Sequence, residues 1–275
     1  MGTIVVDGIT RELNLSKDLL DVRDLPRIAR VAEIPVRASV RAGMPAVEDQ
    51  GSRGKCTGMG WGAMVAFALI KQGVLLAPSG DFIYYCELDA AGDLPNDVGS
   101  TVRNGGMVLV KVGVSSLKFY SFDVDGFPTK PSLSAYGQAA LFQAVKIERI
   151  PDLVGVRQHL AEGWPVVFGT DLYRSFESIQ ADGIMPMPTE GELANGPIGA
   201  HCMVCVGYEN ETQDHPITLR NSWGAGFGDA GYVHVPTAFM EKNASDYWTL
   251  ELMENGVATQ CAPSWLSRLL PWHWL

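Results

Sequence analysis

An apolar stretch over residues 56–72 places the strongest constraint on how this chain can fold. It has no proline and little charge, and its large apolar side chains leave no polar face. A helix that is apolar all round has to be covered on every side. Gly58, Gly60 and Gly62 each weaken such a helix by roughly 1 kcal/mol relative to alanine. Their presence indicates that other parts of the chain pack closely against it.

The remaining pattern divides the chain into a helix-rich first half and a strand-rich second half, which predicts an α+β fold with two lobes. Further helices are expected over residues 80–90, 101–112 and 156–162, and strands over 166–168, 203–208, 217–219 and 232–235. The expected organisation is a leader over 1–40, a main domain over 41–260 with a helical lobe over about 41–120 and a β lobe over about 121–260, and a tail over 261–275.

Composition narrows the class of protein. The net charge of −10 and the pI of about 4.9 disfavour binding to nucleic acid. Five cysteines in 275 residues indicate no disulfide framework. The sequence has neither a secretory signal nor a run of about eighteen apolar residues that could span a membrane. We therefore expect a cytoplasmic location, or export by a route that reads no N-terminal signal.

Three short blocks carry groups suited to nucleophilic chemistry. They are Gln50-Gly-Ser-Arg-Gly-Lys-Cys56, His201-Cys-Met-Val-Cys-Val-Gly-Tyr208, and Asn221-Ser-Trp-Gly224. A thiol attacks carbonyl groups only as the thiolate, which a helix N-terminus and a neighbouring imidazolium both favour. Cys56 stands where a loop becomes a helix. His201 is the candidate base, Asn221 can orient its imidazole, and Gln50 can donate to a developing oxyanion.

In their order and separation, these blocks resemble the papain family of cysteine peptidases. His201 follows Cys56 by 145 residues and Asn221 follows it by 165. The resemblance implies a helical lobe that carries the nucleophile helix and an antiparallel, β-barrel-like lobe that carries His201 and Asn221. It also implies hydrolysis of peptide or protein substrates through an acyl-thioenzyme, without metal or cofactor. In the family, the tryptophan at the position of Trp223 shields the Asn–His hydrogen bond from water.

The block around the nucleophile departs from the family pattern. Arg53 replaces a cysteine that normally forms a lobe-stabilising disulfide, as in bacterial members that lack it. Thr57 replaces an aromatic residue, which puts the shape of the primed side of the cleft in question. Ala200 stands where plant members often carry aspartate.

The substrate-binding residues are predicted partly by counting. The family's Gly-Gly pair precedes a helix of about three turns, and that helix ends here at Gly113. The pair Gly99-Ser100 leaves room for those turns, whereas Gly105-Gly106 does not. Gly99 and Ser100 are therefore the predicted substrate-pairing strand, with Ala200 beside the base and Gly169 as a candidate for lining the specificity pocket.

Other interpretations remain open. The same groups would serve a transamidase, ligase or deamidase, and a catalytically dead binding module is a third reading. The Cys202-x-x-Cys205 pair beside His201 lacks the further ligands of a zinc site and is expected to be structural. His159 and His215 are expected at the surface.

The two ends of the chain carry separate expectations. The leader is far shorter than the helical pro-segments of lysosomal relatives, and we expect it to lie across or near the cleft and restrain access. The tail holds three of the seven tryptophans. It is expected to pack on its own domain, with docking to a partner or a membrane surface as the alternative.

Overall fold

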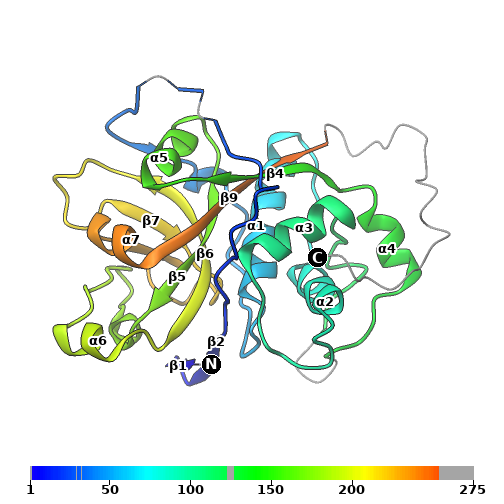
Figure 1. Cartoon of the computed structure of the whole chain (residues 1–275), viewed down its shortest axis with the longest axis horizontal. Helices are drawn as coiled ribbons and strands as arrows, with labels where there is room; N and C mark the ends of the chain where they lie inside the picture. Colours follow the sequence, from blue (N-terminus) through cyan, green and yellow to red (C-terminus); the bar gives the residue numbers. More distant parts are fainter. Residues whose placement is uncertain (1, 29, 32, 123–126, 254–275) are drawn as a thin grey trace.

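The helix at the centre of the molecule is α1 (Cys56–Lys71), and every residue from Cys56 to Leu69 is buried. The computed structural model describes residues 2–28, 30–31, 33–122 and 127–253. In Figure 1, α1 runs between the two lobes, with the other helices of its own lobe on one side and a sheet on the other. The predicted all-round burial of this helix is confirmed.

The glycines of α1 differ in how closely the neighbouring chain approaches them. A Cβ on Gly58 would come within 2.2 Å of the backbone oxygen of Gly80, at the start of α2 (Gly80–Ala91). A Cβ on Gly60 would lie 3.0 Å from the Cys202 sulfur, whereas one on Gly62 would have 3.7 Å of space. Close packing against backbone thus requires glycine at position 58, whereas Gly60 is in tight contact with side chains of the sheet.

The helical lobe also contains α3 (Val102–Lys111) and α4 (Leu133–Ala139). Ser79, Thr101 and Ser132 cap α2, α3 and α4, each accepting a hydrogen bond from a backbone amide of the first turn. The ring of Phe82 on α2 packs edge-on against Tyr120 and Tyr136, with centroids 5.9 and 5.3 Å apart. These aromatic contacts keep the segment through α4 on the helical lobe, so the lobe extends to about residue 143 rather than 120.

The second lobe is a seven-stranded antiparallel sheet with the order β4-β9-β5-β6-β7-β8, in which β3 also pairs with β6. Its strands are β3 (Ala38–Ser39), β4 (Ala144–Ile150), β5 (Val166–Leu172), β6 (Gly199–Tyr208), β7 (Ile217–Arg220), β8 (Tyr232–Val235) and β9 (Ala244–Leu252). Its helices are α5 (Leu153–Ala161), α6 (Glu190–Asn195) and α7 (Thr237–Asn243). The two-lobed α+β architecture predicted from the sequence is confirmed, although strands β4 and β9 were not predicted.

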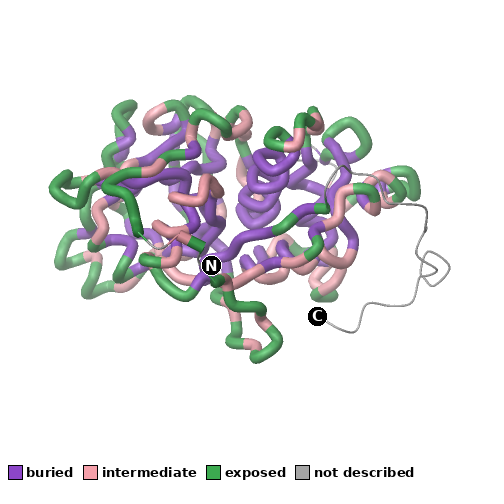
Figure 2. The backbone as a smooth tube through the Cα atoms, turned by 90° about the horizontal axis from the view of Figure 1, so that it is seen from above, coloured by how far each residue is buried: buried purple, intermediate pink, exposed green. Residues whose placement is uncertain are grey.

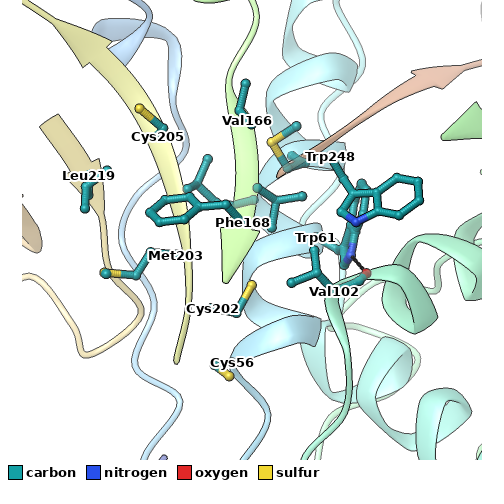
Figure 3. Packing of buried hydrophobic residues seen from close by; sticks show 14 of the residues in the cluster. Cys56, Trp61, Val102, Val166, Phe168, Cys202, Met203, Cys205, Leu219 and Trp248 are labelled. Atoms are coloured by element: carbon teal, nitrogen blue, oxygen red, sulfur yellow. Dashed lines mark hydrogen bonds between the residues drawn. The ribbon is translucent and has the colours of Figure 1, made fainter. Parts of the chain in front are cut away.

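The buried residues form one core that spans both lobes. Figure 2 shows the buried backbone concentrated in α1 and the sheet, with exposed segments around the rim. In Figure 3, Trp61 of α1 and Trp248 of β9 lie on the side of the core nearest Val102, and Phe168, Met203 and Leu219 fill the sheet side. Among the described residues, no helix is both long and apolar enough to cross a membrane.

The leader forms a hairpin and then an extended segment. Strands β1 (Gly2–Val6) and β2 (Ile9–Leu13) pair with each other, and Ile4 and Leu13 are buried. From β2 the chain passes between the two lobes, along the front of α1 in the view of Figure 1. Its backbone bonds to the main sheet at Ala200 of β6 and at Arg149 of β4, and residues 38–39 then join the sheet as strand β3.

Candidate active site

The loop that leads into α1 is held by a carboxylate from the helical lobe. Asp97 accepts a hydrogen bond from the backbone N–H of Gly54 at 3.2 Å and another from the hydroxyl of Tyr84. Its other oxygen lies 3.7 Å from the guanidinium of Arg53. An ion pair therefore joins the two loops at the position where Arg53 replaces a cysteine.

Cys56 is the first residue of α1, and its thiol is shielded from solvent. Burial raises the pKa of this thiol to about 12, while hydrogen bonds from the backbone amides of Cys202 and Thr57 act in the opposite direction. The neighbouring Lys55 pairs with Asp81 on α2. The helix N-terminus favours the thiolate, but in this closed arrangement burial outweighs it and the thiol stays protonated.

His201 lies on β6 with one ring nitrogen bound and the other unpaired among the described residues. Its Nε2 is 2.8 Å from Asn221 Oδ1, which also accepts the backbone N–H of Ser222 at 2.8 Å. Because Oδ1 can only accept, Nε2 carries the hydrogen and Nδ1 has a lone pair available for a proton. Burial lowers the pKa of His201 to about 4. In this tautomer Nδ1 of His201 can act as a base and accept a proton.

Two further predicted groups surround this pair. The ring of Trp223 lies 5.0 Å from the ring of His201, and Trp223 is itself packed against Phe176 and Phe227. Gln50 is 1% exposed. Its Oε1 accepts the hydroxyl of Ser222 at 2.5 Å, while its Nε2 donates to the backbone oxygen of Arg53 at 2.9 Å. The amide of Gln50 is thereby fixed beside the nucleophile loop, with a second N–H still to use.

The predicted substrate-binding residues are in contact with the leader. The backbone N–H of Leu15 donates to Ala200 O at 3.2 Å, and that of Ser16 donates to Ser100 O at 2.9 Å. Leu15 also lies against Gly169, where a Cβ would come within 2.8 Å of its side chain. Residues 13–16 thus lie between the helical lobe and β6, against the residues predicted to bind substrate.

Asn14 of the leader lies against the end of the nucleophile loop. A Cβ on Gly54 would come within 2.3 Å of the Asn14 amide, and one on Gly99 within 2.1 Å of its backbone oxygen. Gly99 also has a φ of +77°, which favours glycine. The leader thus reaches within two residues of Cys56. By contrast, Gly105 and Gly106 lie inside α3.

Comparison with known proteins identifies the family. A family model described as papain family cysteine protease matches residues 34–247. This chain belongs to the papain family of cysteine proteases. An uncharacterised peptidase C1-like protein of Acanthamoeba polyphaga mimivirus is 32% identical over 231 residues, which cover 78% of this chain and 73% of the viral protein.

Solved structures support the same assignment. Xylellain, a cysteine protease from Xylella fastidiosa, has a TM-score of 0.78 and 29% identity, covering 86% of this chain and 95% of its own. The digestive procathepsin L 3 of Tenebrio molitor has a TM-score of 0.65 at 16% identity, with coverage of 83% and 73%, and shows the fold alone. The predictions of a papain-like fold and of a cysteine peptidase are confirmed.

The structure corrects the reading of Thr57 among the departures from the papain pattern. Thr57 is fully buried and donates a hydrogen bond to Glu87 of α2 at 2.5 Å. It faces the interior of the helical lobe, so the replaced aromatic residue does not bear on the primed side of the cleft.

His159 is also placed differently from the prediction. It is 4% exposed, with its Nε2 2.6 Å from the Thr249 hydroxyl, and Arg27 of the leader donates to its Nδ1 at 3.2 Å. It therefore lies beneath the leader rather than at the surface. The Cys202 side chain packs against Gly60, and Cys205 is buried as well.

Sequence reasoning did not identify the ionic contacts that hold the leader. Asp18 accepts hydrogen bonds from the backbone of Arg103 at 3.0 Å and from the Trp248 indole at 2.6 Å. Asp24 accepts from Arg103 Nε at 2.6 Å, and Arg149 lies 3.6 Å from Asp24. The aspartates that stand three residues apart in the leader were the only hint of these contacts in the sequence. Their arginine partners lie on two different elements, α3 and β4, so the pairing could not be predicted.

Proposed function

We propose that Cys56, His201, Asn221 and Gln50 carry out peptide-bond hydrolysis in this papain-family enzyme. His201 Nδ1 takes the thiol proton, and the thiolate of Cys56 attacks the carbonyl carbon. The imidazolium gives that proton to the leaving amine, which breaks the C–N bond and leaves a thioester. Water, deprotonated by His201, then releases the acid and regenerates the thiol. The hydrogen bond that fixes the tautomer of His201 is the observation that supports this assignment best.

Gln50 and Trp223 support the reaction without forming bonds to the substrate carbon. The amide of Gln50 and the backbone N–H of Cys56 donate to the developing oxyanion. Trp223 keeps water from the hydrogen bond between His201 and Asn221. A peptide-library cleavage profile of the wild type against Cys56→Ala tests the mechanism. We expect cleavage that the variant lacks, whereas equal product from both chains would overturn the assignment.

We further propose that the leader holds the enzyme in a latent state. It lies against Ser100, Ala200 and Gly169, the residues assigned to substrate, and the side chain of Leu15 takes the place of a substrate side chain. With the leader in place, the thiol and the imidazole are both neutral. Its release would hydrate them and favour the thiolate–imidazolium pair.

A pair of leader substitutions tests this proposal. Leu15 is 8% exposed and lies in the cleft, whereas Leu20 is 89% exposed and lies outside it. Leu15→Asp places a charge in an apolar site, which should destabilise the closed position of the leader by at least roughly 1.4 kcal/mol. The turnover of the full chain should therefore rise at least about tenfold. Leu20→Asp should leave turnover unchanged. Equal rates in both variants and the wild type would contradict the proposal.

The Trp-rich tail, which we expected to pack on its own domain or to dock a partner, lies outside the described residues. A docking role for residues 261–275 therefore stays a prediction from the sequence.

A further inference from the structure

Glu87 is a buried carboxyl group directly beneath the first turn of α1. It lies on α2 and is 0% exposed. Its Oε2 accepts a hydrogen bond from Thr57 Oγ1 at 2.5 Å. Thr57 directly follows the nucleophile Cys56, so Glu87 is hydrogen-bonded to the residue next to it.

The packing around Glu87 leaves it little room to move. A Cβ on Gly105 of α3 would come within 2.5 Å of Glu87 Oε1 and within 2.4 Å of the Trp61 ring. The Trp61 indole donates to Val102 O at 2.7 Å, a second link between α1 and the start of α3 (Figure 3). Glu87 Oε1 has no hydrogen-bond partner among the described residues. The carboxyl group is therefore held by shape as well as by Thr57.

The surroundings of Glu87 favour the uncharged acid. Among the ion pairs of the described residues, none includes Glu87. A buried carboxylate without a cation is costly, and such a group keeps its proton instead. In agreement, burial raises the pKa of Glu87 from its ordinary 4.5 to about 8.

We propose that Glu87 is a positioning residue that holds the Cys56-bearing turn of α1 in place through the hydrogen bond it accepts from Thr57. The inference rests on the proposed role of Cys56. It also gives Thr57 a purpose, because its hydroxyl is the partner through which Glu87 reaches the nucleophile's turn. Ionised Glu87 would act against catalysis, since its charge raises the pKa of the Cys56 thiol.

Three substitutions separate hydrogen bonding, charge and packing. Glu87→Gln keeps an acceptor for Thr57 and stays neutral at every pH. Glu87→Met keeps the volume without the acceptor, and Thr57→Val removes the hydroxyl from the other side. Each is compared in the full chain carrying Leu15→Asp, so that leader opening does not limit the rate. The measurements are kcat, KM and the rate at which the epoxide inhibitor E-64 labels Cys56, from pH 5 to 9.5.

We expect Glu87→Met and Thr57→Val to lower kcat/KM at least tenfold in chains that remain folded. Glu87→Gln should restore the rate near pH 6.5. Above pH 8 the labelling rate of Glu87→Gln should exceed that of the unsubstituted Glu87 at least threefold, because only glutamate becomes charged there. Full activity in Glu87→Met, or a Glu87→Gln profile parallel to that of glutamate up to pH 9.5, would overturn the proposal.

The equilibrium of unfolding gives a second readout that does not depend on turnover. The pKa of Glu87 is raised on folding, so the folded chain holds an additional proton between pH 4.5 and 8. This contribution to stability is complete below pH 4.5 and is lost as the pH rises to 8. In that window the folding constant should fall up to about tenfold more per pH unit in the wild type than in Glu87→Gln. Equal slopes would overturn the inference, whereas absence of turnover and labelling at Cys56 would instead remove the proposed function.

Discussion

Gln50 is held by Ser222 on one side and by the backbone of Arg53 on the other, so its amide is preorganised before a substrate binds. Preorganised donors stabilise a developing oxyanion without having to reorient during the reaction. The geometry of Gln50 therefore makes a quantitative prediction about kcat.

Replacing Gln50 with alanine should lower kcat by about 10²–10³ with a smaller change in KM, because the lost donor acts mainly in the transition state. Steady-state kinetics in the Leu15→Asp chain would measure both constants. Gln180→Ala is the matched control, since the Gln180 side chain is exposed and donates to the backbone oxygen of Ser178, away from the proposed site. A tenfold rise in KM at unchanged kcat would contradict the assigned role.

At the scale of single residues, the sequence predicted those groups whose chemistry is tied to a motif. Cys56, His201, Asn221 and Gln50 were predicted as the catalytic set because their thiol, imidazole and amide side chains stand in the order typical of the family. Thr57 was placed on the wrong side because its partner Glu87 lies thirty residues away on another helix. His159 was expected at the surface because the sequence of its own helix gives no indication of its partners Arg27 and Thr249, which lie far away along the chain.

Among the elements, α1 depends on its glycines to different degrees. Gly58→Ala should destabilise the fold by about 1–3 kcal/mol, the usual range for overpacking, because the new methyl group would collide with the backbone of Gly80. Gly62→Ala, one turn further along, should be neutral or stabilising by up to about 1 kcal/mol, since its methyl group has space and alanine favours helix. Denaturant unfolding of the two variants measures the difference. Equal losses of stability would show that the close approach at Gly58 is relieved at little cost.

The leader carries two titrating contacts of opposite sign. Burial raises the pKa of Asp18 from its ordinary 3.8 to about 6, so its contribution to closure is present at low pH and is lost as the pH rises through 6. Burial and the nearby Arg27 lower the pKa of His159 from 6.5 to about 4. The contribution of neutral His159 is present above pH 6.5 and is lost as the pH falls toward 4. Between pH 4 and 6 the two effects oppose each other.

Asp18→Asn should therefore make the leader open on acidification. The substitution removes the contribution of Asp18 and leaves that of His159. The equilibrium constant for leader closure should then fall by up to about tenfold for each pH unit below pH 6. The measurement is the labelling rate of Cys56 at pH 4.5 and 7, divided at each pH by the rate in the Leu15→Asp chain. A ratio that changes no more in Asp18→Asn than in the wild type would exclude this balance.

Element positions were predicted best where periodicity is local. The helices that begin at Cys56, Gly80 and Val102 have clear apolar patterns or capping residues, and they lie where expected. Strands β4 and β9 were missed because they pair with each other across about one hundred residues. No local pattern announces such a pairing. The β1–β2 hairpin of the leader was not predicted either.

On the scale of the whole molecule, the two lobes and the leader form one closed unit. Helix α1, which begins at Cys56, packs against strand β6, which carries His201, and the leader passes between the two lobes (Figure 1). The division into a helix-rich first half and a strand-rich second half was enough to predict the two lobes. The course of the leader depends on scattered ionic partners, and the helical lobe extends past its predicted limit because distant aromatic residues pack on α2.

The most direct test of this account is the labelling of Cys56 by E-64, followed by intact-mass measurement and peptide mapping of the full chain and its Leu15→Asp variant. We predict a single adduct, on Cys56, that forms at least about ten times faster in the variant. Labelling of Cys86 or Cys205 in place of Cys56, or equal rates in both chains, would contradict the assignment of a nucleophile covered by its own leader.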